Sequence, residues 1–268
     1  MIKLHFTKLG EGCPLIVLHG LYGSGTNWHN IGKALSSYFT VYLLDQRNHG
    51  ESPHDPDLNY EAMTDDLREF MDNEKLDSAC LLGHSMGGKV AMNFALNYPD
   101  RVDKLVVIDI ALRSYREDFI GGQTLQSTIH QKIVRALSGL DIDFIETREE
   151  ADKQLARDLP QRAVRQFLLK NLKRKGNGEF YWGLNLEAVK ANLFQVLDKV
   201  ERSGKTFGKP VLVINGSKSG YITEQDKKEF RETFPAVRIE DLDAGHWVHV
   251  EQPEELIKLL TQFLTEKD

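Results

Sequence analysis

Four strand-length runs of almost continuously apolar residues mark the first part of this 268-residue chain, at 15–18, 41–44, 79–82 and 105–108. Such runs are typical of parallel strands covered on both faces, because neither face is left for polar side chains. Helix-like stretches separate them, at 27–37, 60–73 and 86–98. This alternation predicts an α/β fold with a mostly parallel central sheet and helices on both of its faces.

The alternation stops at about residue 113, and no clear pattern of a buried strand follows until residue 205. Amphipathic helical patterns fill this stretch, at 129–137, 147–159 and 163–172. Strand patterns then return at 211–214 and 237–242, followed by a last helix at 253–263. We therefore expect a core domain made of 1–112 and 206–268, with residues 113–205 forming a helical cap inserted between two strands of the sheet.

The composition argues against several classes of protein. Hydrophobic residues make up 41% of the chain and charged residues 28%, which suits a folded domain with a real core. The formal net charge of -6 argues against a nucleic-acid partner, and the apolar runs are far shorter than the roughly 20 residues of a membrane span. Cys13 and Cys80 lack a metal or redox spacing and are expected to be buried free thiols. No signal-peptide pattern opens the sequence, so a cytoplasmic location is expected.

The strongest chemical signal is Gly83-His84-Ser85-Met86-Gly87, which matches G-x-S-x-G. It follows one apolar run and opens a helical pattern, which is the strand–turn–helix context that this motif requires. A sharp turn there would project the Ser85 hydroxyl above the sheet, and the positive end of the helix dipole would favour a developing oxyanion. We expect Ser85 to be the nucleophile.

A serine hydroxyl is a weak nucleophile and needs an imidazole within hydrogen-bond reach to take its proton. Among nine histidines, His246 has the fitting position, after the last predicted strand and last in the chain order serine, aspartate, histidine. Gly245 permits the tight turn that would aim this ring inward. His249 is the alternative base.

The loop after the first apolar run reads His-Gly-Leu-Tyr-Gly at 19–23. In a fold with a nucleophile turn of this kind, that loop supplies one backbone N–H of the oxyanion hole, which we assign to Leu21. The residue after the nucleophile, Met86, supplies the second. The side chain of His19 is expected to brace the loop rather than to take part in chemistry.

The acid of the expected triad is the least obvious member. In many enzymes of this kind it lies in the loop after the strand that follows the cap, but that loop has Ser219 and no carboxylate at 215–221. Asp109 ends the strand after the nucleophile helix, at the sheet edge where active sites assemble. We expect Asp109 to be the acid and Ser219 an auxiliary hydrogen-bond partner; Asp226 and Asp243 are the rivals.

Taken together, these segments resemble the α/β-hydrolase superfamily over nearly the full length, and more narrowly the bacterial YbfF-type esterases and their mitochondrial relatives. The resemblance rests on HGLYGS at 19–24, DQRNHGES at 45–52, GHSMGGK at 83–89, VIDIA at 107–111, RQFLLKNL at 165–172 with Trp182, and GHWVH at 245–249. It implies an aspartate acid at the position of Asp109 and an active-site serine at Ser219. It also implies carboxylesterase or thioesterase activity on short-to-medium acyl chains, without a metal or an organic cofactor.

The expected function is therefore hydrolysis of a small acyl ester, or of a thioester such as acyl-CoA, through an acyl-enzyme. A cofactor-free haloperoxidase or a carbon–carbon bond hydrolase would use the same three residues, and a non-catalytic ligand receptor can keep them too. The cap also carries Lys170, Lys173, Arg174 and Lys175 close together. They could attract an anionic substrate group, although a solvated helix end is the simpler interpretation.

Overall fold

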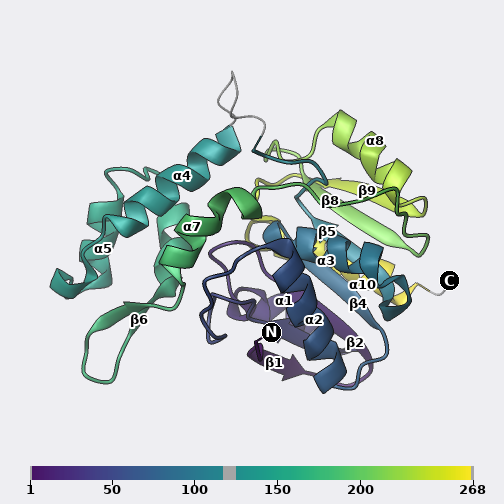
Figure 1. Cartoon of the computed structure of the whole chain (residues 1–268), viewed down its shortest axis with the longest axis horizontal. Coiled ribbons are helices and arrows are strands. Elements are labelled where there is room, and N and C mark those ends of the chain that lie inside the picture. The colour runs from purple at the N-terminus through teal and green to yellow at the C-terminus, as the bar shows by residue number, and fades with distance from the viewer. Residues whose placement is uncertain (1, 117–124, 267–268) are drawn as a thin grey trace.

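The computed structural model describes residues 2–116 and 125–266, and within them one large sheet is flanked by helices (Figure 1). Its seven described strands lie in the order β1-β3-β2-β4-β5-β8-β9. β1 runs antiparallel to β3, and every other neighbouring pair is parallel. The strands are β1 (Phe6–Leu9), β2 (Cys13–Leu18), β3 (Phe39–Leu44), β4 (Ala79–His84), β5 (Val102–Ile108), β8 (Val211–Gly216) and β9 (Val237–Leu242). The predicted, mostly parallel α/β sheet is confirmed.

Helices cover both faces of this sheet because its inner strands are apolar on both sides. Leu15 and Val17 of β2 belong to the core on one face, with residues of α1 and α10. Ile16 and Leu18 belong to the core on the other face, with residues of α2 and α3. The helices of the core are α1 (His29–Leu35), α2 (Tyr60–Asn73), α3 (Met86–Asn97), α8 (Glu224–Thr233), α9 (Val248–Glu251) and α10 (Pro253–Thr265).

A mainly helical insertion follows β5 and ends before β8, and Figure 1 shows its helices α4, α5 and α7 gathered to one side of the sheet. Its elements are α4 (Leu125–Ser138), α5 (Arg148–Leu155), α6 (Arg162–Leu168), β6 (Leu172–Arg174), β7 (Phe180–Trp182) and α7 (Leu186–Val196). β6 and β7 form a small antiparallel hairpin that was not predicted. Of the predicted cap range 113–205, residues 117–124 lie outside the described residues. Short 3₁₀ helices lie at Gly25–Trp28, Pro99–Arg101, Ile142–Phe144 and Leu169–Asn171.

The chain enters and leaves the insertion along two segments that are hydrogen-bonded to each other. The N–H of Tyr115 donates to the carbonyl of Leu197, and the N–H of Val200 donates to the carbonyl of Leu112, both at 2.8 Å. The ammonium of Lys89, on α3, donates to the main-chain carbonyl of Arg113 on the entering segment and to that of Asp198 on the leaving segment. Burial lowers the pKa of Lys89 to about 7. The two ends of the insertion are thus joined to each other beside the helix that follows Ser85.

One sequence expectation was wrong: Cys13 is exposed, whereas Cys80 is buried as predicted. Cys13 opens β2, and the strand reaches full burial only from its third residue onward. Burial raises the pKa of the Cys80 thiol to about 12, so that this thiol stays protonated.

Candidate active site

Ser85 lies in a sharp turn between β4 and α3, with φ 52° and ψ −121°. Left-handed backbone of this kind is unfavourable for a residue with a side chain and is maintained by the surrounding structure. Two glycines make the turn possible. A Cβ on Gly83 would lie 2.3 Å from the carbonyl oxygen of Gly87, and a Cβ on Gly87 would lie 2.3 Å from the carbonyl oxygen of Leu18. The turn therefore requires glycine at both positions, because no larger residue fits there.

The structure brings Ser85, His246 and Asp109 into one hydrogen-bonded line. His246 Nε2 is 3.0 Å from Ser85 Oγ, and His246 Nδ1 is 2.7 Å from Asp109 Oδ2. Asp109 directly follows β5, is fully buried and has φ 48°. A carboxylate that accepts a hydrogen bond from Nδ1–H leaves Nε2 without a proton, which is the tautomer that can take a proton from a serine hydroxyl.

The second oxygen of Asp109 also has partners. Oδ1 accepts hydrogen bonds from the main-chain N–H of Gly216 at 2.8 Å and from the hydroxyl of Ser219 at 2.7 Å. Both donors come from the end of β8 and the loop after it. They fix the orientation of the carboxylate, and they are charge-assisted hydrogen bonds that stabilise its ionised form.

The rival acids are engaged elsewhere. Asp226 is buried at the start of α8, where its carboxylate accepts from the N–H and the hydroxyl of Thr223 and pairs with Arg113. Asp243 is exposed and forms an ion pair with Lys218 at 2.8 Å. Neither carboxylate has a contact with the histidine of the site among the described interactions.

His249, the alternative base, lies in a different environment. Its ring stacks on Trp28 at 4.5 Å, and within the described residues neither buried ring nitrogen has a hydrogen-bond partner. Burial lowers its pKa to about 3. The ring is thus held neutral in an apolar setting, and the structure places His246, not His249, against Ser85.

Two residues at the site were not foreseen from the sequence. Tyr221 stacks on the ring of His246, with centroids 3.9 Å apart, and burial raises the pKa of its phenol. His130, from α4, lies 3.2 Å from the hydroxyl of Tyr221 and 3.4 Å from that of Tyr22. Burial lowers the pKa of His130 to about 4. Tyr221 follows Ser219 in one loop and so had a positional signal, whereas His130 had none, because its place depends on how the insertion packs.

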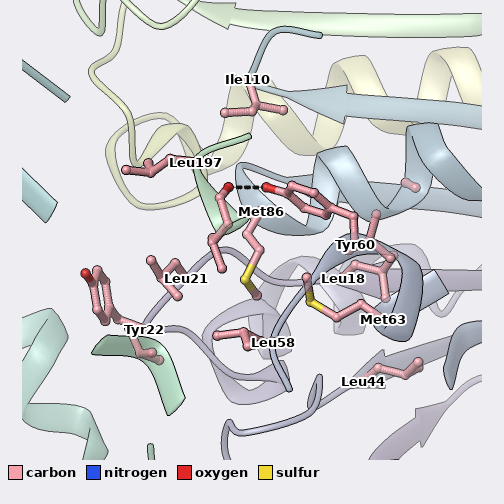
Figure 2. Close-up of a cluster of buried hydrophobic side chains, with 14 of the residues drawn as sticks. Leu18, Leu21, Tyr22, Leu44, Leu58, Tyr60, Met63, Met86, Ile110 and Leu197 are labelled. Carbon is pink, nitrogen blue, oxygen red and sulfur yellow. Dashed lines mark hydrogen bonds between the residues drawn. The ribbon is translucent and has the colours of Figure 1, made fainter. Parts of the chain in front are cut away.

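The loop assigned to the oxyanion hole lies beside Ser85. A Cβ on Gly20 would lie 3.1 Å from the Cβ of Ser85. Within the described residues, no hydrogen-bond acceptor is found for the N–H groups of Leu21 and Met86. Their side chains belong to one apolar cluster, which Figure 2 shows in part. Two main-chain donors close to the serine are therefore available to a ligand.

The side chain of His19 braces this loop. Its Nδ1 hydrogen-bonds the carbonyl of Gly20 at 2.9 Å, and its Nε2 accepts from the N–H of Gln46 at 3.0 Å. Burial lowers the pKa of His19, which keeps the ring neutral so that it can donate on one side and accept on the other.

A cavity of about 400 Å³ opens onto Ser85. The core contributes the serine, its histidine partner and Tyr221, whereas the insertion contributes much of the apolar wall. The apolar lining residues include Leu21, Ile133, Leu159, Val164, Phe167, Leu168 and Trp247. A mainly apolar pocket with a few convergent polar groups is typical of a small-molecule site.

The basic cluster of the insertion contributes no residue to the lining of this cavity. Its members are Lys170, Lys173, Arg174 and Lys175. Arg174 lies over the ring of Phe180 at 4.6 Å, and Lys175 forms an ion pair with Glu179. Arg174 and Lys175 therefore have partners within the hairpin of β6 and β7.

Comparison with known proteins decides the family. The profile of the alpha/beta hydrolase fold family matches residues 14–253. The chain belongs to this family. The hydrolase is 39% identical over 264 residues to a zebrafish (Danio rerio) protein named sn-1-specific diacylglycerol lipase ABHD11, covering 97% of this chain and 80% of that one. It is 32% identical over 256 residues to Esterase YbfF of Escherichia coli, covering 94% and 93% of the two chains.

Solved structures agree with this assignment. A structure titled "Marine microorganism esterase" superposes on the hydrolase with a TM-score of 0.93 at 41% identity, covering 98% of this chain and 100% of that one. In the described part of the hydrolase, no helix has both the length and the apolar character needed to cross a membrane. Nor do its described His, Cys, Asp and Glu residues form a group of three or more that could hold a metal ion.

Proposed function

We propose that this hydrolase is a serine carboxylesterase acting on short-to-medium acyl esters through Ser85, His246 and Asp109. The observation that carries the proposal is the pair of contacts at His246, 3.0 Å from Ser85 Oγ on one side and 2.7 Å from Asp109 Oδ2 on the other. This line of side chains ends in a mainly apolar cavity, where an acyl group would be shielded from water.

In the first half of the reaction, Ser85 Oγ attacks the ester carbonyl carbon while His246 Nε2 takes the hydroxyl proton. The carbonyl oxygen becomes an oxyanion and accepts hydrogen bonds from the N–H groups of Leu21 and Met86. The carboxylate of Asp109, held by Ser219, stabilises the imidazolium. Collapse of the tetrahedral intermediate releases the alcohol, which takes its proton from His246, and leaves the acyl group on the serine oxygen.

In the second half, water replaces the alcohol. His246 takes a proton from the water as the water oxygen attacks the acyl carbon, and the same two N–H groups hold the second oxyanion. Collapse breaks the bond to Ser85 Oγ, which recovers its proton from the imidazolium. The carboxylic acid then leaves, and each step is balanced without a metal or an organic cofactor.

The substrate class follows from the cavity and from the relatives. An apolar pocket of about 400 Å³ suits an acyl chain of short or medium length. The names of the relatives add glycerolipid esters to the substrates worth testing. Thioesters such as acyl-CoA are also worth testing on chemical grounds, although no residue of the basic cluster lines the cavity. We also propose that residues 113–205 form the cap that selects the acyl group, and a cytoplasmic location stays a prediction.

The decisive experiment is active-site labelling with a fluorophosphonate. We expect the parent protein to be labelled and to hydrolyse p-nitrophenyl butyrate, and Ser85→Ala to do neither. Ser217→Ala is the matched control, because Ser217 is exposed in the loop after β8. Labelling that survives in Ser85→Ala would remove this serine from its role.

A panel of p-nitrophenyl esters of increasing chain length, with acyl-CoA and diacylglycerol, would then define the substrate. Absence of ester turnover in a folded, labelled protein would favour the haloperoxidase or carbon–carbon bond hydrolase alternatives. Absence of labelling as well would favour a non-catalytic receptor.

A further inference from the structure

The loop that carries Leu21 is held by hydrogen bonds on several of its peptide groups. The carbonyl of Gly20 accepts from the N–H of Gly23 at 2.9 Å and from His19 Nδ1 at 2.9 Å. A trans peptide directs its C=O and its N–H to opposite sides. Because the carbonyl of Gly20 is held from one side, the N–H of Leu21, in the same peptide group, is directed to the other.

The next peptide groups of the loop are held as well. The N–H of Tyr22 donates to His49 Nε2 at 3.3 Å, and Tyr22 has φ 65°, a left-handed conformation that costs energy in a residue other than glycine. Burial lowers the pKa of His49 to about 3, which keeps its ring neutral and able to accept. The strained conformation of Tyr22 therefore depends on partners outside the loop.

One of those partners comes from the insertion. Asn171, which ends the 3₁₀ helix Leu169–Asn171, donates its side-chain N–H to the carbonyl of Tyr22 at 2.7 Å. Asn171 is 5% exposed, and its own carbonyl accepts from Gly183. A second contact joins the insertion to the same residue, since His130 lies 3.4 Å from the Tyr22 hydroxyl. The insertion thus holds both the main chain and the side chain of Tyr22.

These contacts form a short relay from the insertion to the N–H of Leu21. Asn171 holds the carbonyl of the peptide group between Tyr22 and Gly23. The N–H of that same group donates to the carbonyl of Gly20. The Gly20 carbonyl belongs to the peptide group whose N–H is that of Leu21. Each link is one hydrogen bond or one rigid peptide plane. A displacement of the Asn171 side chain therefore rotates the peptide group that carries the Leu21 N–H.

We propose that Asn171 is a positioning residue for catalysis: by holding the Tyr22 carbonyl, it aligns the Leu21 N–H with the oxyanion and makes the complete oxyanion hole depend on the docked insertion. The inference rests on the proposed function, in which Leu21 is an oxyanion donor. It goes beyond that function because it assigns a role in rate, not in substrate binding, to a residue of the insertion that does not line the cavity.

The chain offers a matched control in Asn192, on α7. Like Asn171, it is a buried asparagine of the insertion that donates one side-chain N–H to a main-chain carbonyl of the core, that of Pro56, at 2.8 Å. The side-chain amide of Asn171 also donates to the carbonyl of Leu168 in its own segment, and that of Asn192 likewise donates to the carbonyl of Ala188. The difference is that Pro56 is not part of the oxyanion loop.

The experiment compares Asn171→Asp and Asn171→Ala with Asn192→Asp and Asn192→Ala in the full chain. Aspartate has the same shape but places an acceptor against the carbonyl, and alanine removes the donor. For p-nitrophenyl butyrate we expect the Asn171 variants to lose about 10- to 100-fold in kcat with KM nearly unchanged, short of the loss for a deleted oxyanion donor. The Asn192 variants should stay within about threefold of the parent in both constants.

A second readout isolates the oxyanion. A butylboronic acid forms a tetrahedral adduct with a catalytic serine, so its inhibition constant should rise in the Asn171 variants by about the same factor as kcat falls. Thermal unfolding of all four variants separates folding from function, because both asparagines lose equivalent hydrogen bonds.

The inference is overturned if the Asn171 and Asn192 variants have equal kcat and equal boronate affinity, or if the Asn171 variants change KM alone. It is supported if kcat and boronate affinity fall together at position 171 only. Failure of the proposed function would be seen differently, as turnover that survives in Ser85→Ala.

Discussion

Replacing Asp109 with asparagine tests the assignment of the acid, and the structure predicts how the new amide would sit. Oδ1 of Asp109 accepts from the fixed main-chain N–H of Gly216 and from Ser219. The amide oxygen must therefore occupy that position, which leaves the NH₂ group facing His246 Nδ1, 2.7 Å away. An NH₂ group at that place donates to Nδ1 and puts the imidazole proton on Nε2.

This tautomer cannot accept the proton of Ser85. The same change of tautomer in a protease triad lowers kcat by about 10⁴-fold, which corresponds to about 5 kcal/mol of transition-state stabilisation. We expect a loss of that size in the kcat of Asp109→Asn for p-nitrophenyl butyrate. The thermal stability should change little, because the replacement has the same shape and keeps its partners.

Asp226→Asn and Asp243→Asn are the controls. Asp243 is exposed, so its variant should retain normal turnover. Asp226 is buried and caps α8, so its variant should lose about 1–3 kcal/mol of stability without losing catalysis. Near-normal turnover in Asp109→Asn, together with an inactive variant at either control position, would refute the reasoning.

Three further predictions concern the supports of the site. Ser219→Ala should lower kcat by only about tenfold in steady-state kinetics, because the Gly216 N–H still holds the carboxylate of Asp109. A loss as large as that of Asp109→Asn would contradict an auxiliary role for Ser219. Gly87→Ala places a Cβ 2.3 Å from the Leu18 carbonyl oxygen, so we expect a protein with strongly lowered melting temperature and no turnover; parental stability would show that the turn can adapt. The third is a dependence of stability on pH. Because burial lowers the pKa of His49 to about 3 from 6.5, the unfolded chain binds a proton between these values that the folded chain does not. The free energy of unfolding should therefore decrease as the pH falls through this window, and His49 should contribute up to about 1.4 kcal/mol per pH unit. Urea titrations at several pH values would measure this dependence, and His49→Gln should lack the contribution of His49.

The sequence predicted the parallel sheet because its inner strands are apolar on both faces, and that pattern is independent of any partner. It missed β1 at the edge of the sheet, whose first and last residues are half-buried and whose two middle residues are exposed, so that no alternation marks it. It also missed the hairpin of β6 and β7, since three-residue strands are too short to show a period of two. Cys13 was misjudged because an apolar neighbourhood in sequence does not say where burial begins along a strand.

The candidate site likewise contains residues that sequence rules could place and residues that they could not. Ser85 and His246 were placed by a local motif and by chain order, and Asp109 by the rule that strand ends share one edge of the sheet. The structure brings these three together with Ser219, while their roles stay predictions. Tyr22, His130 and Asn171 meet only because the insertion folds back over the core, and such contacts between distant segments have no period or spacing in the sequence.

The paired segments at the base of the insertion have a consequence for how such a protein can change. Hydrogen bonds between Tyr115 and Leu197, and between Val200 and Leu112, hold the two ends of the insertion together. Once the ends of a segment are fixed side by side, doubling its length costs only about 0.6 kcal/mol in closure entropy. Segments of other lengths can therefore be grafted between these anchor points while β5 and β8 keep their pairing. If the insertion selects the acyl group, as proposed above, we expect exchange of the insertion to change specificity while the turn at Ser85 stays the same.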